Sequence, residues 1–210
     1  MVTTLLADDH VLVRQGLRSL LEGAGFQIVG EASNGHEAVE LVRKLRPQVA
    51  ILDLGMPVLN GIDATREIIK IAGGTTKVIL LTMYFEQSYV MAALSAGVHG
   101  YVLKHRAATS LIDAIHEVQK GNTYLSPDIS RSVIETFTAD PAQESEALSV
   151  RERQVLQLVA EGMSTKGIAD LLSISVKTAE SHRTRIMQKL GIHDTAGLVL
   201  YAIRKGIIQA

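Results

Sequence analysis

Residues 5–17 read LLADDHVLVRQGL, in which a short apolar run meets two aspartates and then passes into apolar residues at helical spacing. An apolar run followed by a helix-like segment occurs five times before residue 121. The helix-like segments lie at about 11–23, 35–45, 62–72, 86–96 and 108–120. The apolar runs, which we expect to be buried strands, are Thr3–Ala7, Gln27–Ala32, Val49–Asp53, Lys77–Thr82 and Gly100–Leu103. Five strand–helix pairs in a row predict an α/β fold with a doubly wound, five-stranded parallel sheet.

The chain changes character after this region. From residue 148 onward, apolar residues recur only at helical spacing, and this part carries 9 Lys and Arg against 5 Asp and Glu. The first 147 residues carry 12 against 17. We therefore expect a sheet domain over residues 1–121, a linker with a helix near 127–137 over residues 122–147, and a basic all-α domain over residues 148–210.

The composition excludes several classes of protein. The 210 residues contain no cysteine, which excludes a disulfide scaffold, a thiol nucleophile and a cysteine-ligated metal site. An apolar content of 47% with 20% charged residues is ordinary for a globular chain and excludes a low-complexity one. No stretch reaches the roughly 18 apolar residues of a membrane span. We expect a cytoplasmic protein with no membrane partner.

Three carboxylates stand at the ends of predicted strands. Asp8 and Asp9 follow the first strand and Asp53 ends the third, and a strand order of 2-1-3-4-5 would make these two strands neighbours. Clustered acids repel unless a cation neutralises them, and oxygen ligands favour Mg²⁺. Thr82 and Lys104, at the ends of the fourth and fifth strands, add a hydroxyl and an ammonium that suit a phosphoryl group. The alternative for each acid alone is that it caps the next helix.

The C-terminal part has start and stop signals of helices. Ser149 and Glu152 form an S-x-x-E capping box before the first apolar pattern. Ser175 is the expected N-cap of a helix over Val176–Leu190, which ends at Gly191. A short helix, a tight turn and this longer helix together predict a helix-turn-helix.

The long helix has two contrasting faces. Its apolar sector, which we expect to face the core, holds Val176, Ala179, Ile186, Met187 and Leu190. The opposite sector has Glu180 at its edge and holds Lys177, Ser181, Thr184, Arg185 and Gln188. Short donors and cations suit the base edges and phosphates of double-stranded DNA. The alternative is an ordinary solvated helix face, which the preceding turn and helix disfavour.

Four stretches together resemble the receiver domain of bacterial response regulators: LLADDHVLVRQGL, ILDLGMPVLNGID from residue 51, LLTMY from residue 80 and GYVLKH from residue 100. The resemblance covers about residues 1–121. It implies that Asp53 accepts a phosphoryl group from the phosphohistidine of a partner sensor histidine kinase. It also implies a Mg²⁺ ion held by Asp9, Asp53 and the backbone carbonyl of Gly55, with Asp8 orienting a metal-bound water.

The resemblance also implies a switch in the same pocket. Thr82 and Lys104 would contact the phosphoryl oxygens, and Tyr101 would turn inward when Thr82 moves. The chain departs from the family at positions that bear on access to the pocket and on phosphoryl lifetime, namely Met83, Gly55 and Tyr84. No essential group is lost, so we expect phosphorylation at a rate that these residues alter.

The stretch KTAESHRTRIMQKLGI at residues 177–192 resembles the LuxR-type helix-turn-helix of the NarL/FixJ response regulators. The resemblance covers Leu148–Ile192. It implies that Lys177 and Thr178 grip the DNA backbone. It further implies bases facing Glu180, Ser181 and Thr184, with support from His182, Arg183 and Arg185. Because Arg183 projects near the apolar sector, we expect it to reach a phosphate.

A fourth helix, about Asp194–Lys205, is the dimer contact on DNA in this family. Its apolar stripe gives the expected dimerisation residues Leu198, Val199 and Ala202. Gly167 and Gly197 depart from the family pattern. Each would cost about 1 kcal/mol relative to alanine inside a helix, so we expect two less rigid helices.

Together these patterns predict a transcription regulator, not an enzyme, switched by phosphorylation of Asp53. We expect phosphorylation to release the DNA-binding domain and to form a homodimer on an inverted-repeat operator. One alternative is a DNA-binding regulator that works without phosphorylation and uses its receiver for dimerisation, which Met83 and Gly55 support. Another is a phosphohydrolase with an aspartate nucleophile, which Gly55 disfavours because such enzymes carry a second acid there.

Overall fold

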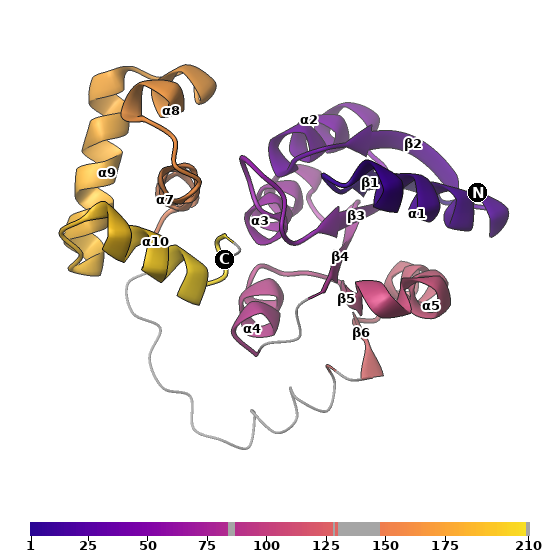
Figure 1. Ribbon diagram of the computed structural model, residues 1–210. Coiled ribbons are helices and arrows are strands. Elements are labelled where there is room, and N and C mark those ends of the chain that lie inside the picture. The colour runs from indigo at the N-terminus through magenta and orange to yellow at the C-terminus, as the bar shows by residue number, and fades with distance from the viewer. Residues whose placement is uncertain (84–86, 128, 130–147, 209–210) are drawn as a thin grey trace. The chain divides into compact units, whose positions relative to one another are not determined.

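The computed structural model describes residues 1–210 except 84–86, 128, 130–147 and 209–210. The chain divides into two compact units, Met1–Asp140 and Pro141–Ala210 (Figure 1). Most of the predicted linker, including most of its predicted helix at 127–137, falls outside the described residues, so the domain boundaries stay a prediction. Among the helices that are described, none is both long and apolar enough to cross a bilayer.

The first unit is built on a parallel sheet in the order β2-β1-β3-β4-β5-β6. Five strands have the predicted bounds: β1 (Thr3–Ala7), β2 (Gln27–Ala32), β3 (Val49–Asp53), β4 (Lys77–Thr82) and β5 (Gly100–Leu103). The sheet nevertheless has six strands and not five, because β6 (Tyr124–Leu125) pairs with β5. Two residues are too few to produce a periodic signal in the sequence.

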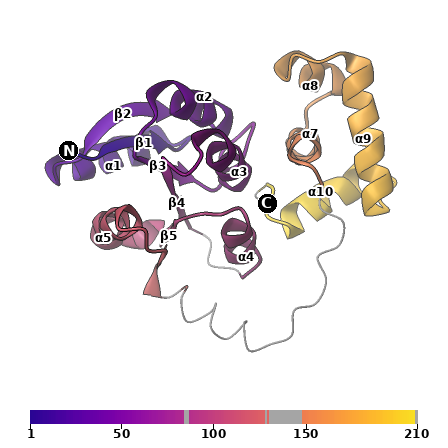
Figure 2. The same cartoon turned by 180° about the vertical axis from the view of Figure 1, so that it is seen from behind.

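Helices cover both faces of this sheet (Figure 1, Figure 2). They are α1 (Val11–Gly23), α2 (Gly35–Leu45), α3 (Gly61–Ala72), α4 (Gln87–Ser95) and α5 (Ala107–Gln119), with the 3-10 turn η1 (Lys104–Arg106) before α5. Successive strand residues point to opposite faces, so Leu5 packs in the core with α2, α3 and α4, while Leu6 packs in the core with α1 and α5. The doubly wound architecture is therefore confirmed.

The turn between β3 and α3 is held in a tight, unusual backbone conformation. The amide of Leu59 donates to the carbonyl of Pro57 at 2.8 Å, and the intervening Val58 has a φ of 69°. A β-branched residue rarely adopts this conformation. Gly61 then passes so close to β3 that a Cβ atom would lie 2.2 Å from the carbonyl oxygen of Asp53. The turn thereby fixes the backbone that carries Asp53.

The second unit consists of α7 (Val150–Ala160), α8 (Thr165–Leu171), α9 (Val176–Leu190) and α10 (Thr195–Arg204). The predicted capping box is confirmed, because the side chain of Ser149 accepts from the Glu152 amide and Glu152 accepts from the Ser149 amide. Ser175 caps α9, and Gly191 ends it at a φ of 63°. The helices enclose one apolar core, which includes Val155, Leu158, Ile168, Ala179, Ile186, Leu198 and Ala202.

The two glycines that depart from the family pattern lie in the first turns of α8 and α10, not in helix interiors. The amide of Gly167 donates to the cap side chain of Ser164, and that of Gly197 donates to Asp194. At Gly197 a Cβ atom would lie 2.7 Å from Ile192 Cγ2. The cost of glycine applies to helix interiors and does not carry over to these capped first turns, so a lower rigidity of the two helices stays a prediction.

Candidate functional site

An acidic pocket with one lysine forms at the carboxyl ends of the strands. β1 and β3 are neighbours, so Asp8 and Asp53 converge, with 2% and 5% of their surfaces exposed. Lys104, directly after β5, places its ammonium 2.9 Å from Asp8 Oδ2 and 3.0 Å from Asp53 Oδ1. Three residues that lie far apart in the sequence thus share one buried site, as the strand order predicts.

The pocket has the donor set of a divalent-cation site. Ligand atoms of Asp8, Asp9, His10 and Asp53 all lie within 4.8 Å of one another. Asp8 Oδ2 is buried 2.9 Å from the Lys104 ammonium, and Asp9 Oδ1 is buried 2.8 Å from the ring Nδ1 of His10. Several carboxylate oxygens gathered in one place are the ligand set that a hard cation such as Mg²⁺ prefers. Gly55, the expected backbone ligand, is half-buried in the turn after β3.

His10 belongs to this cluster, although the sequence pattern gave no reason to place it there. Its ring Nδ1 lies 2.8 Å from Asp9 Oδ1 and 3.3 Å from Asp8 Oδ1, while 67% of its side chain is exposed. Its amide donates to Asp8 Oδ1 at 2.8 Å, and the residue is the N-cap of α1. Ligand spacing along the sequence missed this histidine because it joins the acids as their direct neighbour in the turn.

The charges in the pocket oppose one another. Burial raises the pKa of Asp53, and the Asp8 and Asp9 carboxylates add to this effect against the opposing Lys104 ammonium. Burial lowers the pKa of Lys104, but the Asp53 and Asp8 carboxylates outweigh burial and raise it above its usual value. The Lys104 ammonium therefore favours the charged form of Asp53, and the two carboxylates in turn favour the charged form of the lysine.

The expected switch residues line the neighbouring strands. Thr82, at the end of β4, and Tyr101, in β5, are both fully buried. Tyr101 belongs to the core that α2, α3 and α4 cover, so its ring occupies the inward position. Met83 is 60% exposed, so it does not pack into the pocket. Tyr84 lies outside the described residues.

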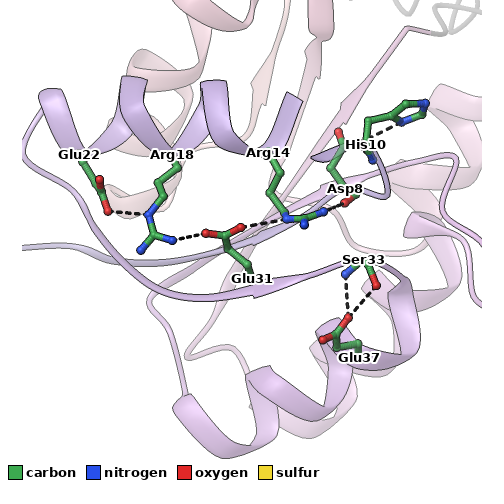
Figure 3. A network of polar contacts seen from close by, with 8 residues as sticks. All are labelled: Asp8, His10, Arg14, Arg18, Glu22, Glu31, Ser33 and Glu37. Atoms are coloured by element: carbon green, nitrogen blue, oxygen red, sulfur yellow. Dashed lines mark hydrogen bonds and ion pairs between the residues drawn. The ribbon is translucent and has the colours of Figure 1, made fainter. Parts of the chain in front are cut away.

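A network of charged side chains joins the pocket to α1 and β2 (Figure 3). Arg14 donates from Nη1 to the carbonyl oxygen of Asp8 at 2.6 Å and from Nε to Glu31 Oε2 at 2.9 Å. Arg18 contacts both Glu31 and Glu22. Sequence reasoning missed this network because Arg14 and Glu31 lie 17 residues apart, and only the pairing of β1 with β2 brings them together.

The polar face of α9 is exposed as expected. Its residues Lys177, Thr178, Glu180, Ser181, Thr184 and Arg185 are all exposed, and His182 is half-buried. A surface hollow of 310 Å³ is lined by Ser175, Lys177, Thr178, Ser181, His182 and Arg185. On the opposite face Ala179 and Ile186 are buried, but Val176 is 47% exposed. The assignment of Val176 to the core was wrong. Val176 is the first residue of α9, and the helix packs on the core only from Ala179 onward.

Two other expectations for this unit need correction. Arg183 Nη2 donates to Thr195 Oγ1 at 2.6 Å and so joins α9 to α10, while its expected contact with a phosphate stays a prediction. Leu198 and Ala202 are fully buried in the unit's own core, where α10 packs on α7. An apolar stripe marks the inward face of a helix, so these two residues are not exposed to a partner in this structure, and the expected dimer contact through α10 stays a prediction. Leu200 is 55% exposed, and Val199 is half-buried.

Comparisons with known proteins agree with both units. Residues 4–116 match the family of response regulator receiver domains, and residues 146–202 match the luxR family of bacterial regulatory proteins. The chain is a response regulator of the NarL/FixJ family. The regulator combines a receiver with a LuxR-type DNA-binding domain, which makes it a DNA-binding response regulator.

The regulator matches its relatives along nearly their whole length. It is 37% identical to the oxygen regulatory protein NreC of Staphylococcus carnosus, over 98% of each chain. It is 33% identical to the transcriptional regulatory protein DegU of Brevibacillus brevis, over 99% of this chain and 95% of that one. Among solved structures, RcsB in complex with DNA has 31% identity and a TM-score of 0.61, over 97% of this chain and 98% of that one. RcsB has also been solved as two dimers bound to two parallel DNAs.

Proposed function

We propose that Asp53 is the phosphoacceptor of this response regulator and that a sensor histidine kinase is its donor. A carboxylate oxygen of Asp53 attacks the phosphorus of a phosphohistidine, the phosphorus–nitrogen bond breaks, and the histidine leaves with its electron pair. The product is an acyl phosphate on Asp53. The observation that carries this proposal is the position of the Lys104 ammonium, 3.0 Å from Asp53 Oδ1, where it can neutralise phosphoryl oxygens.

The carboxylates of the pocket fit a Mg²⁺ ion. Asp9, Asp53 and the carbonyl of Gly55 would hold it, and Asp8 would orient a water bound to it. When bound, the ion neutralises negative charge on the carboxylates and on the incoming phosphoryl group. The gathering of ligand atoms from Asp8, Asp9 and Asp53 within 4.8 Å of one another supports this assignment.

The output of the switch is DNA binding. Thr82 and Lys104 hold the phosphoryl oxygens, and the movement of Thr82 stabilises the inward position of Tyr101. This local charge change shifts the receiver between two conformations. The shift releases the DNA-binding domain and favours a homodimer. Lys177 and Thr178 then contact the DNA backbone, while Glu180, Ser181 and Thr184 face the bases of an inverted repeat. The exposed polar face of α9 supports this role.

One experiment tests the chemical step. The purified chain is incubated with acetyl phosphate and Mg²⁺, and its mass is followed with time. We expect an adduct of one phosphoryl group on the wild type and none on Asp53→Asn. Footprinting with and without beryllofluoride tests the output, which should change for the wild type and not for Asp53→Asn. Equal responses of the two proteins would contradict the switch.

A second candidate is a regulator that binds DNA without phosphorylation and uses its receiver for dimerisation. The observation that favours it is the burial of Asp53, which is only 5% exposed and limits access to the carboxylate. Failure to detect any adduct, together with DNA binding by Asp53→Asn equal to the wild type, would support it. A phosphohydrolase is disfavoured because Gly55 has no side chain to act as acid or base.

A further inference from the structure

The acidic turn is held from outside the pocket by one side chain. The hydrogen-bond ladders of β1 with β2 and with β3 both end at Ala7, so the carbonyl of Asp8 lies beyond the sheet. Arg14, in the first turns of α1, reaches back and donates to this carbonyl oxygen at 2.6 Å (Figure 3). The contact closes the turn from Asp8 to His10 against the helix that follows it.

The guanidinium of Arg14 is itself fixed in place. Its Nε donates to Glu31 Oε2 on β2 at 2.9 Å, and only 16% of its side chain is exposed. A guanidinium with two such contacts has a defined orientation, because its donors form a rigid fork. The amide of Asp8 donates to Ala32 on the same strand at 3.2 Å. Both backbone polar groups of Asp8 are therefore tied to β2, one directly and one through Arg14 and Glu31.

We propose that Arg14 is a positioning residue for the divalent-cation site, which it preorganises by fixing the Asp8–Asp9 turn from behind. The inference rests on the proposed function, because it assumes that these carboxylates hold the ion. Arg14 touches the backbone of Asp8 and acts on the ion only through the turn. Partners of this kind, which orient the groups that bind a metal, typically change metal affinity by about 10–100-fold when they are removed.

Positioning and simple electrostatics predict opposite results when Arg14 is removed. Arg14 carries a positive charge beside a cation site, so electrostatics alone predicts that its loss strengthens cation binding. The loss of Arg14 would also leave the negative charge of Glu31 less neutralised, which again predicts stronger cation binding. A positioning role predicts weaker binding, because the turn must be ordered at the moment the ion binds. The sign of the change therefore identifies the role.

The test is titration of the full chain with Mn²⁺, followed by electron paramagnetic resonance of the free ion, with Mg²⁺ as competitor. We expect Arg14→Met to weaken Mn²⁺ binding by about tenfold. Arg14→Lys should be intermediate, because an ammonium can hold the Asp8 carbonyl without the second, oriented contact to Glu31. Arg18→Met is the matched control, because it removes the same charge from the same helix. The Arg18 side chain contacts Glu31, as Arg14 does, but within the described residues it makes no hydrogen bond or ion pair with Asp8.

The outcomes separate this inference from the proposed function. Unchanged or tighter Mn²⁺ binding by Arg14→Met would overturn the positioning role while leaving the cation site intact. Equal weakening by Arg14→Met and Arg18→Met would also overturn it, because charge or general damage would then explain the result. If the wild type binds no divalent ion, the proposed site itself is wrong. If Arg14→Met does not fold, Glu31→Gln and Arg14→Lys carry the same comparison.

Discussion

The Lys104 ammonium lies 3.0 Å from Oδ1 of Asp53. It also contacts Asp8, so the lysine lies among the carboxylates whose negative charge a divalent ion would share. Under the proposed function, Lys104 would therefore have two effects of opposite sign in this pocket. It would compete with the ion for the negative charge of the carboxylates, and it would supply positive charge for phosphoryl oxygens.

Replacement of Lys104 should separate these effects. In Lys104→Met we expect tighter Mn²⁺ binding, because the competing cation is gone, together with phosphorylation by acetyl phosphate slowed by about 100-fold or more. Titration with Mn²⁺ and the rate of adduct formation by mass measure the two results. Lys44→Met, at an exposed position near the end of α2, should change neither. Weaker Mn²⁺ binding by Lys104→Met would contradict the competition.

The close approach of Gly61 to β3 predicts a large cost for any side chain there. Gly61→Ala would place a Cβ atom 2.2 Å from the Asp53 carbonyl oxygen, so the backbone that carries Asp53 must shift. We expect a loss of about 1–3 kcal/mol in the free energy of unfolding. Gly16→Ala, on α1 with nothing within 4 Å of the new Cβ, should instead stabilise the protein by about 0.5–1 kcal/mol. Urea denaturation of both variants measures the contrast, and equal effects would refute it.

His99 should make the receiver less stable in mild acid. Its Nδ1 accepts from the Val78 amide at 3.2 Å, and burial, with the charge of Lys77, lowers its pKa. The unfolded chain then binds the proton more tightly than the folded one. Stability is therefore complete above the unfolded pKa of about 6.5 and is lost as the pH falls below it.

The variant His99→Asn tests this pH dependence, because Asn offers a similar acceptor that does not titrate. Denaturation of the wild type and the variant is compared at pH 7.5 and at pH 5, which are about one unit or more on each side of the unfolded pKa. We expect the wild type to lose more stability between these two conditions than His99→Asn does. Parallel losses would show that His99 does not contribute.

The pair formed by Glu152 and Lys189 should stabilise the helical unit. Lys189 Nζ donates to Glu152 Oε2 at 2.7 Å. Burial raises the pKa of Glu152, but the contacts with Lys189 and the Ser149 amide outweigh burial and lower it. The folded state therefore binds the proton less tightly, so this stability is present above the unfolded pKa of about 4.3 and is lost as the pH falls.

We expect Glu152→Gln to cost about 1–2 kcal/mol at pH 7, because it removes a charge-assisted hydrogen bond and keeps the shape of the cap. Calorimetry of the full chain at pH 7 and pH 4 provides the measurement, and the difference between wild type and variant should shrink at pH 4. The control is Glu180→Gln, on the exposed face of α9, which should leave stability unchanged. A difference that grows at pH 4 would contradict this account.

The polar face of α9 predicts the form of the DNA affinity. Lys177 is exposed beside the surface hollow, so in Lys177→Ala we expect binding to weaken for all sequences alike and the slope of log affinity against log salt to fall by about 1. Fluorescence anisotropy at several salt concentrations measures both. Lys205→Ala, exposed beyond α10, is a control for net charge. A change confined to one DNA sequence would assign Lys177 to base recognition.

The sequence was sufficient for the strands and for the convergence of Asp8, Asp53 and Lys104. Each strand is short, apolar and followed by a helical pattern, and parallel strands bring their ends to one edge. The sequence was insufficient for contacts between side chains on different helices and strands, because these depend on how the elements pack. The pairing of Arg14 with Glu31 depends on the register of β1 and β2. Helical spacing likewise showed that Leu198 and Ala202 share a face, but not that this face packs on α7.

The short strand β6 joins the end of the receiver to the backbone of β5. Its residues pair with Gly100 and Tyr101, and the Ser126 amide donates to the Tyr101 carbonyl at 3.0 Å. Ser126 Oγ also accepts from the Leu103 amide at 3.3 Å. Residues 124–126, from which the chain continues toward the second unit, are thus hydrogen-bonded to the strand that carries the buried Tyr101. A displacement of that backbone would therefore be passed directly to β6 and Ser126.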